Sequence, residues 1–191
     1  MEKKLRLIAI ANRWHIREAE EEIGDSLYIY DRKCLELRLD PEYPLIYVYS
    51  CLESSKVFNY IIQEPPAYIE RIVPVQIIYK QVIRLMNEDL LHSGSVFDIL
   101  RQFVRARCGE SCLVEAHPRN FYIVYRDKLT RRQAQKYVQK MIASYLGVRI
   151  DRKAKYSLIL EDTRLGIIGA ILLRGTDRIR YWRRRRLSLD T

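Results

Sequence analysis

Glycine is scarce in this chain, and long apolar runs are missing. Seven glycines among 191 residues exclude collagen-like and glycine-rich low-complexity sequences. No apolar stretch reaches the roughly 18 residues that a membrane-spanning helix needs. An apolar run near the start ends at Asn12-Arg13-Trp14, without the small-residue cleavage site of a signal peptide. We therefore expect a cytoplasmic protein that has no membrane partner.

Cysteine is also limited, to four residues that are too few and too scattered for the disulfide framework of a secreted domain. Cys34 and Cys51 lie in apolar, strand-like stretches, where cysteine usually behaves as a small buried hydrophobe. Cys108 and Cys112 have C-x3-C spacing and His117 nearby, but a second ligand pair is missing, so we predict no metal site. A Cys108–Cys112 disulfide is the alternative if the source is a hyperthermophile, in which intracellular disulfides occur.

The motifs of common catalytic and nucleotide-binding sites are absent. The sequence contains no GxGxxG, P-loop, HExxH or GxSxG pattern. The adjacent acidic pairs Glu88-Asp89 and Glu161-Asp162 do not converge on one point in a helix or a strand, and we interpret them as solvated turns. We therefore expect no catalytic residue and no cofactor, and a protein that is not an enzyme.

Positive charge is concentrated in the C-terminal part of the chain. Residues 1–80 carry 11 basic and 13 acidic side chains, whereas residues 81–191 carry 23 basic and 11 acidic ones. This asymmetry indicates a polyanion-binding half, and nucleic acid is the usual polyanion for a cytosolic protein. A membrane surface is the competing partner. The densest basic run, 178–186, lacks the broad apolar face of a membrane-lying helix, which favours nucleic acid.

The first 79 residues show an α+β pattern with more strand than helix. An apolar run at 5–11 predicts a buried strand, and an acidic segment at 13–23 predicts a helix that ends at Gly24. The segment 54–62 predicts a second helix, which a proline pair stops. Short strands are predicted at 27–30, 34–39, 44–49 and 71–79, the last restricted by Pro74 to a sheet edge or a bulge.

The remaining chain predicts the order α, β, α, β, β over residues 95–174, after a helical linker candidate at 80–92. Amphipathic spacing and caps define the two helices. The elements are a helix from Ser95, a strand at 120–126, a helix from Thr130 to Leu146 closed by Gly147, and strands at 156–161 and 166–174 about a turn at 162–164.

Two basic segments in this part are candidate RNA contacts. On the helix at 130–146, Arg132, Lys136 and Lys140 recur every four residues along a line beside the apolar stripe. This row fits a solvated surface or a phosphate-binding surface, and the cations Arg126, Lys128 and 178–186 in the same half favour phosphate binding. Near the C-terminus, Tyr181-Trp182 between Arg180 and Arg183 can stack on unpaired bases, or Trp182 can pack against the domain. The full set of candidate RNA-binding residues is Arg126, Lys128, Arg131, Arg132, Lys136, Lys140, Arg174, Arg180, Trp182, Arg183 and Arg184.

The element order and several local runs resemble THUMP-domain proteins. The runs are Tyr68-Ile-Glu-Arg-Ile-Val-Pro-Val75, Phe121-Tyr-Ile-Val-Tyr-Arg126 and a Val148-Arg-Ile-Asp151 segment. The Arg-hydrophobic-hydrophobic-Pro run at 71–74 is similar to the end of the ferredoxin-like domain in stand-alone members that assist tRNA cytidine acetylation. Residues 152–155 depart from the family because they contain no proline.

This resemblance implies an α+β fold with an N-terminal ferredoxin-like domain at 1–80, a helical linker at 81–94, and an αβαββ THUMP-like RNA-binding domain with a basic C-terminal tail at 95–191. Fused family members carry an additional enzymatic domain, for which this chain has no room. The resemblance therefore implies a tRNA-binding adaptor that grips the acceptor end and presents tRNA to a separate modifying enzyme. The alternative is a protein-interaction subunit of a larger RNA–protein complex, with no specific tRNA recognition.

Overall fold

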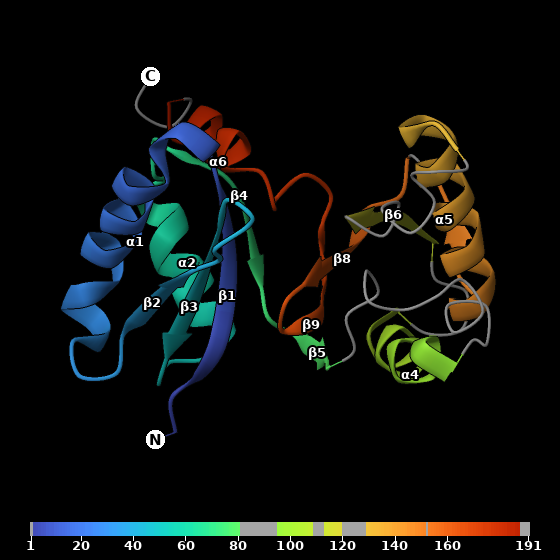
Figure 1. The fold of residues 1–191 in the computed structure, drawn as a ribbon, viewed down its shortest axis with the longest axis horizontal. Coiled ribbons are helices and arrows are strands. Elements are labelled where there is room, and N and C mark those ends of the chain that lie inside the picture. The colour runs from blue at the N-terminus through green and yellow to red at the C-terminus, as the bar shows by residue number, and fades with distance from the viewer. Residues whose placement is uncertain (1, 81–94, 109–112, 120–128, 152, 188–191) are drawn as a thin grey trace. The chain divides into compact units, whose positions relative to one another are not determined.

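The computed structural model describes residues 2–80, 95–108, 113–119, 129–151 and 153–187, drawn in colour in Figure 1. The chain forms two compact units. The first unit comprises Met1–Val75 together with Gly175–Thr191, and the second comprises Gln76–Arg174. This division differs from the predicted boundaries, because the basic C-terminal segment folds with the first unit and not with the THUMP-like one. No described helix combines the length and the apolar character that crossing a membrane requires.

The first unit has the ferredoxin-like order βαββαβ. Its four strands form an antiparallel sheet in the order β2-β3-β1-β4, and helices α1 and α2 pack against that sheet. The elements are β1 (Lys4–Ala11), a 3₁₀ turn η1 (Arg13–His15), α1 (Ile16–Asp31), β2 (Glu36–Leu39), β3 (Leu45–Ser50), α2 (Ser54–Gln63), β4 (Ile69–Pro74) and the C-terminal α6 (Ile179–Leu187).

Helix α1 is longer than the sequence predicts. It continues through Gly24 to Asp31, so the predicted helix end at Gly24 and the predicted strand at 27–30 are both wrong. Ala19, Ile23 and Leu27 are all buried, and their spacing of four residues keeps them on one side of the helix. Burial of Leu27 on this face therefore extends the helix past a residue of low helix propensity.

The predicted strand at 71–79 is divided between the two units. β4 ends at Pro74 and occupies an edge of the first sheet, as expected for a strand that contains proline. The following strand, β5 (Ile77–Tyr79), pairs with β9 in the second sheet.

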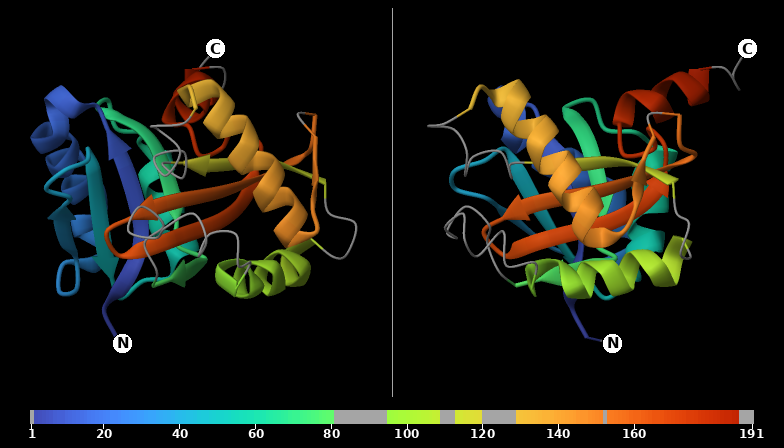
Figure 2. Two further views of the ribbon diagram at one scale, coloured as in Figure 1. Left: turned by 45° about the vertical axis from the view of Figure 1, so that its right-hand side comes forward. Right: turned by 90° about the vertical axis from the view of Figure 1, so that its right-hand side faces the viewer.

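The second unit contains a five-stranded sheet in the order β5-β9-β8-β6-β7, with α4 and α5 packed against one face (Figure 2). Its further elements are α4 (Ser95–Cys108), β6 (Leu113–Arg119), α5 (Arg131–Leu146), β7 (Arg149–Ile150), β8 (Tyr156–Thr163) and β9 (Gly166–Leu173). The core joins Phe97 and Leu100 of α4 to Val138 and Ile142 of α5 and to Leu158 of β8. The two predicted helices and the two predicted closing strands are confirmed, whereas β6 and the short strand β7 lie where no strand is predicted.

In the second unit, the bounds of α5 agree with the prediction, whereas the strand β6 was not predicted. Helix α5 is capped by Thr130 and ends at Gly147 with φ 65°, as predicted, and the structure adds a capping box between Thr130 and Gln133. The sequence analysis missed β6, which contains Pro118. β7 pairs only with Leu113 and Val114 of β6, so Pro118 has no β7 partner at its level. The predicted strand at 120–126, the helix at 80–92 and the Cys108–Cys112 disulfide fall wholly or partly outside the described residues.

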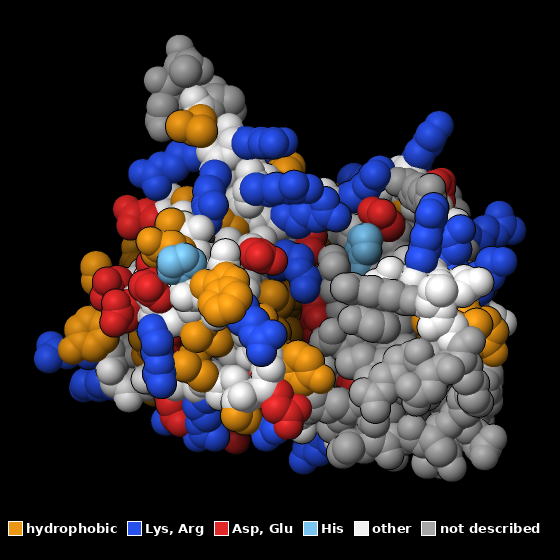
Figure 3. All heavy atoms as spheres, turned by 45° about the horizontal axis from the view of Figure 1, so that its top comes forward, with side chains coloured by type: hydrophobic (Ala, Val, Ile, Leu, Met, Phe, Trp, Pro, Cys, Tyr) orange, Lys and Arg blue, Asp and Glu red, His pale blue; other side chains and the backbone are white. Residues whose placement is uncertain are grey.

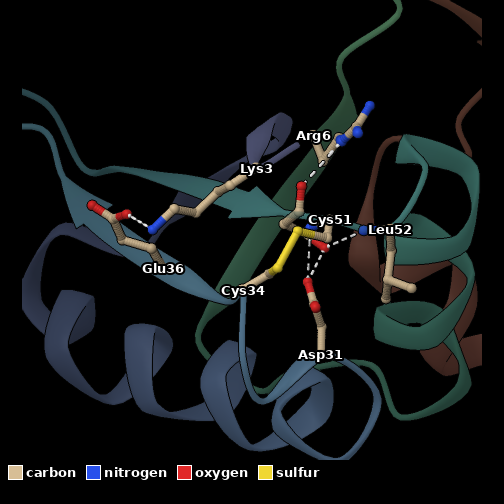
Figure 4. The surroundings of a disulfide bond; sticks show 8 residues. Lys3, Arg6, Asp31, Cys34, Glu36, Cys51 and Leu52 are labelled. Atoms are coloured by element: carbon tan, nitrogen blue, oxygen red, sulfur yellow. Dashed lines mark hydrogen bonds and ion pairs between the residues drawn. A yellow bond between two sulfur atoms is a disulfide. The ribbon is translucent and has the colours of Figure 1, made fainter. Parts of the chain in front are cut away.

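A disulfide joins Cys34 to Cys51, with the two Cα atoms 5.6 Å apart (Figure 4). The prediction that these cysteines are unbonded hydrophobes is therefore wrong. The bond connects the segment between α1 and β2 to the residue that follows β3. Beside it, the carboxylate of Asp31 accepts hydrogen bonds from the Cys51 amide, at 3.0 Å, and from the Ser50 hydroxyl. The α1 terminus, the start of β2 and the end of β3 are thus held together covalently and by hydrogen bonds.

Removing this disulfide is expected to destabilise the first unit. The cysteines are 17 residues apart, and a loop of that length corresponds to about 3 kcal/mol of unfolding free energy in the chain-entropy model. We expect the double variant Cys34→Ala/Cys51→Ala to unfold at lower urea concentration than the oxidised protein. Dithiothreitol should destabilise the unaltered chain by a similar amount and leave the variant unchanged. Equal stability of the oxidised chain and the variant would contradict this prediction.

Candidate nucleic-acid interface

Helix α5 presents a row of cations on the surface of the second unit. Arg132, Lys136 and Lys140 are exposed, whereas Ala134 and Val138 on the other side of the helix are completely buried. The apolar stripe fixes the rotation of the helix, and this rotation directs the cationic positions to solvent. The predicted row is therefore a surface feature of α5.

The three cations of this row have no counterion in the described part of the chain, where no carboxylate lies within 4.0 Å of them. Like charges four residues apart repel one another by a few tenths of a kcal/mol per pair. A bound polyanion would remove this repulsion. Lys and Arg side chains gather over α5 in the space-filling view (Figure 3).

The C-terminal basic run forms a helix, α6, that packs on the first unit. One side of α6 carries Ile179, which is completely buried, and Trp182, which is half-buried. The Trp182 indole N–H donates a hydrogen bond to the Thr176 carbonyl at 2.7 Å. Its ring meets the Phe58 ring edge to face, with centroids 6.2 Å apart. Of the two alternatives for Trp182, the structure shows packing against the domain.

Two arginines on this inner side of α6 bind backbone carbonyls of the first unit. Arg183 donates to the carbonyl oxygens of Pro66 and Ile69, the latter at 3.3 Å. Arg186 donates to the carbonyl of Gln63, the last residue of α2, at 3.2 Å. Cations at a helix C-terminus satisfy carbonyls that have no partner within the helix. Arg183, which is predicted to bind RNA, therefore has a structural role in the first unit.

The other predicted site residues lie in several places. Arg180 and Arg184 are exposed on the outer side of α6. Arg174 is in the second unit, where its Nε lies 3.1 Å from Oε2 of Glu115, a carboxylate that also contacts His117. Arg131 is the first residue of α5, and its side chain is not among the described ones. Arg126 and Lys128 fall outside the described residues.

The structure thus divides the predicted basic surface between two units. The segment 76–174 carries 18 basic and 9 acidic residues, and the segment 175–191 adds 6 basic and 2 acidic residues to the first unit. Tyr181, which is predicted with Trp182 to stack on bases, lines a pocket beside α6 together with Arg178 and Arg185, which are not among the predicted RNA-binding residues. Their spacing of three and four residues is the helical signal that indicates one shared face.

No family model matches this sequence, and no curated protein matches it either. Among solved structures, the chain is similar to the crystal structure of PH1313 from Pyrococcus horikoshii Ot3, with a TM-score of 0.52 and 13% sequence identity over 91% of this chain and 58% of that chain. It is also similar to a 4-thiouridine synthetase in complex with RNA and bound ATP, with a TM-score of 0.42 and 9% identity over 89% of this chain and 42% of that chain.

This chain therefore spans less than two thirds of the length of either structure. At 13% identity, the similarity to PH1313 supports the fold alone. That fold is α+β, with a ferredoxin-like unit and a THUMP-like unit.

The docking of α6 can be tested by truncating Trp182. We expect Trp182→Ala to lower the unfolding free energy of the first unit by about 2–3 kcal/mol, because it removes a half-buried ring and a hydrogen bond. Arg184→Ala, on the outer side of the same helix, should change it by less than about 0.5 kcal/mol. Urea unfolding followed by circular dichroism measures both effects. If the two variants are equally stable, the inner contacts do not hold α6 in place.

Proposed function

We propose that this protein binds tRNA and presents it to a separate modifying enzyme, without catalysing a reaction itself. The observation that carries this proposal is the exposed row of Arg132, Lys136 and Lys140 on α5, in a unit of THUMP-like fold. Contacts of this kind to phosphates supply affinity and fix the register of an RNA, but they do not read its sequence.

The geometry of α5 suits a ribose–phosphate backbone. Residues four apart on a helix are separated by about 6 Å along its axis, so the three cations form a regularly spaced row that is inclined to the axis. A line of this kind follows a strand of phosphates and does not define a pocket for a small molecule. Recognition of folded RNA relies largely on shape and on backbone contacts. We infer that the row lies along the acceptor end of the tRNA.

The adaptor role follows from the absence of catalytic motifs in the sequence. Phosphate contacts without a catalytic centre position an RNA for chemistry that another protein performs. Chemical change of tRNA by the isolated chain would contradict this part of the proposal, and mass spectrometry of the tRNA nucleosides after incubation measures it.

Binding of tRNA to the full chain tests the proposal directly. We expect affinity that falls steeply between 50 and 200 mM salt, because counterions are released from each neutralised phosphate. A tRNA that lacks its single-stranded 3′ end should compete less well than the intact molecule. Absence of tRNA binding at low salt would refute the proposal, and equal competition by the truncated tRNA would refute the acceptor-end contact.

The triple variant Arg132→Gln/Lys136→Gln/Lys140→Gln tests the α5 row. If each cation neutralises one phosphate, the slope of log affinity against log salt should become shallower by about 2–3 units. The matched control is Arg149→Gln/Lys153→Gln/Lys155→Gln, which removes three exposed cations from the same unit. An equal loss of slope in both variants would show that net charge matters and the row does not.

A protein-interaction subunit is the second candidate function, favoured by exposed apolar side chains on the first unit. Trp14 is 85% exposed and Ile29 is 84% exposed. Aromatic side chains such as that of Trp14 are enriched where proteins bind one another. A protein that co-purifies in stoichiometric amount, with nuclease treatment making no difference, would favour this function over tRNA binding.

A further inference from the structure

A pocket of about 440 Å³ lies beside the outer side of α6, within the first unit. The turn before the helix contributes Gly175 and Arg178, and the helix contributes its outward side chains. None of the lining residues is acidic, so the lining carries four positive charges and no negative one. The lining residues are Gly175, Arg178, Arg180, Tyr181, Arg184 and Arg185.

The pocket arginines differ from the two inner arginines of the same helix in their interactions within the protein. Arg183 and Arg186 are engaged with backbone carbonyls. In contrast, the side chains of Arg178, Arg180 and Arg184 have no ion-pair partner among the described residues. Guanidinium groups bind phosphate through two parallel hydrogen bonds, and convergence of several around one space favours a phosphate over a simple anion.

Tyr181 adds an aromatic wall to this pocket. Its side chain is 40% exposed, and its ring meets the Trp182 ring edge to face, with centroids 5.1 Å apart and planes at 86°. Trp182 is itself fixed by its hydrogen bond to Thr176. Tyr181 is therefore a supported aromatic side chain with exposed surface, and such rings stack on nucleobases.

The size of the pocket exceeds what a phosphate group alone requires. Its volume falls within the range of about 300–1,000 Å³ that is typical of small-molecule sites. Cations and an aromatic ring in one pocket match the two parts of a nucleotide, the phosphate and the base. Figure 3 shows Lys and Arg side chains gathered at the α6 end of the first unit.

We propose that this pocket binds one nucleotide of an RNA strand, with its phosphate on Arg178, Arg180 and Arg184 and its base against Tyr181. The inference rests on the proposed function, because it takes RNA as the ligand, and it adds a second RNA contact on the unit that does not carry the α5 row. The phosphate is either a 5′-terminal monophosphate or an internal phosphodiester, which share the same chemistry at the arginines.

The test uses the full chain and a single-stranded RNA hexamer that carries a 5′-phosphate and a 3′ fluorophore, with fluorescence anisotropy as the readout. The variant Arg180→Gln/Arg184→Gln should bind the hexamer about tenfold more weakly at 50 mM salt, because each lost charged hydrogen bond weakens binding. Its slope of log affinity against log salt should fall by about 0.7 units, because the pocket neutralises one phosphate of a single strand. The matched control, Arg13→Gln/Lys56→Gln, removes two exposed cations from the same unit outside the pocket and should change affinity less than about twofold.

Substitution of Tyr181 tests the base contact separately from the charge. Tyr181→Ala should lower hexamer affinity about tenfold while leaving the salt slope unchanged, because stacking releases no counterions. Tyr181→Phe keeps the ring and should bind as the unaltered chain does. A salt slope that falls in Tyr181→Ala, or equal weakening by both substitutions, would refute the stacking role.

The outcomes distinguish the pocket from the proposed function. If the chain binds tRNA but the pocket variant and its control bind the hexamer equally well, the pocket is refuted and tRNA binding stands. If the chain binds neither RNA, both proposals fail. When the pocket variant alone is weakened, a hexamer with a 5′-hydroxyl identifies the source. If the 5′-hydroxyl hexamer binds more weakly than the 5′-phosphate hexamer, the pocket binds the 5′-terminal phosphate. If both bind equally well, the pocket binds an internal phosphodiester.

Discussion

The docking of α6 onto the first unit is the interaction on which the placement of the C-terminal positive charge depends. The segment between α2 and β4 presents carbonyl oxygens at Gln63, Pro66 and Ile69 that receive guanidinium hydrogen bonds from Arg183 and Arg186. Together with Trp182, these contacts fix which side of α6 faces the sheet and which faces solvent. If the helix were rotated by half a turn, the remaining arginines would lose their exposure to water.

The arginines of α6 show that neighbouring residues of one type can serve opposite purposes. A buried carbonyl without a hydrogen-bond partner destabilises a fold by about 1–3 kcal/mol, so a guanidinium that satisfies one is part of the architecture. Arg180 and Arg184, on the other side of the same helix, satisfy no such group. Some of the basic residues of this chain are therefore structural, and others are exposed to solvent. The amino-acid composition alone does not show which residues belong to which group.

Local signals in the sequence predicted some elements well and left others undetected. Thr130 and Gly147 act within their own helix, and the bounds of α5 followed from them. Gly24 is also a local signal, but burial of Leu27 overrides it, so the predicted end of α1 was wrong. The Cys34–Cys51 bond escaped prediction because the fold of β2 and β3 brings the two cysteines together.

The candidate site was also predicted only in part. The α5 row was visible because Arg132, Lys136 and Lys140 repeat at helical spacing beside an apolar stripe. Helix α6 was not recognised, because half of its inner side consists of arginines that bind carbonyls, a pattern that resembles a solvated tail in sequence. The pocket beside α6 depends on that docking, so the sequence indicates stacking by Tyr181 but not the pocket that Tyr181 forms with Arg178 and Arg185.

The first unit is assembled from both ends of the chain, and this has a consequence for the order of events during synthesis. Residues 76–174 of the second unit leave the ribosome before Gly175–Leu187, so the second unit can complete its fold while the first still lacks α6. During that interval, the carbonyls of Gln63, Pro66 and Ile69 are hydrated and the inner arginines have not yet emerged from the ribosome. The ferredoxin-like unit begins first and is finished last, and α6 is the element that completes it.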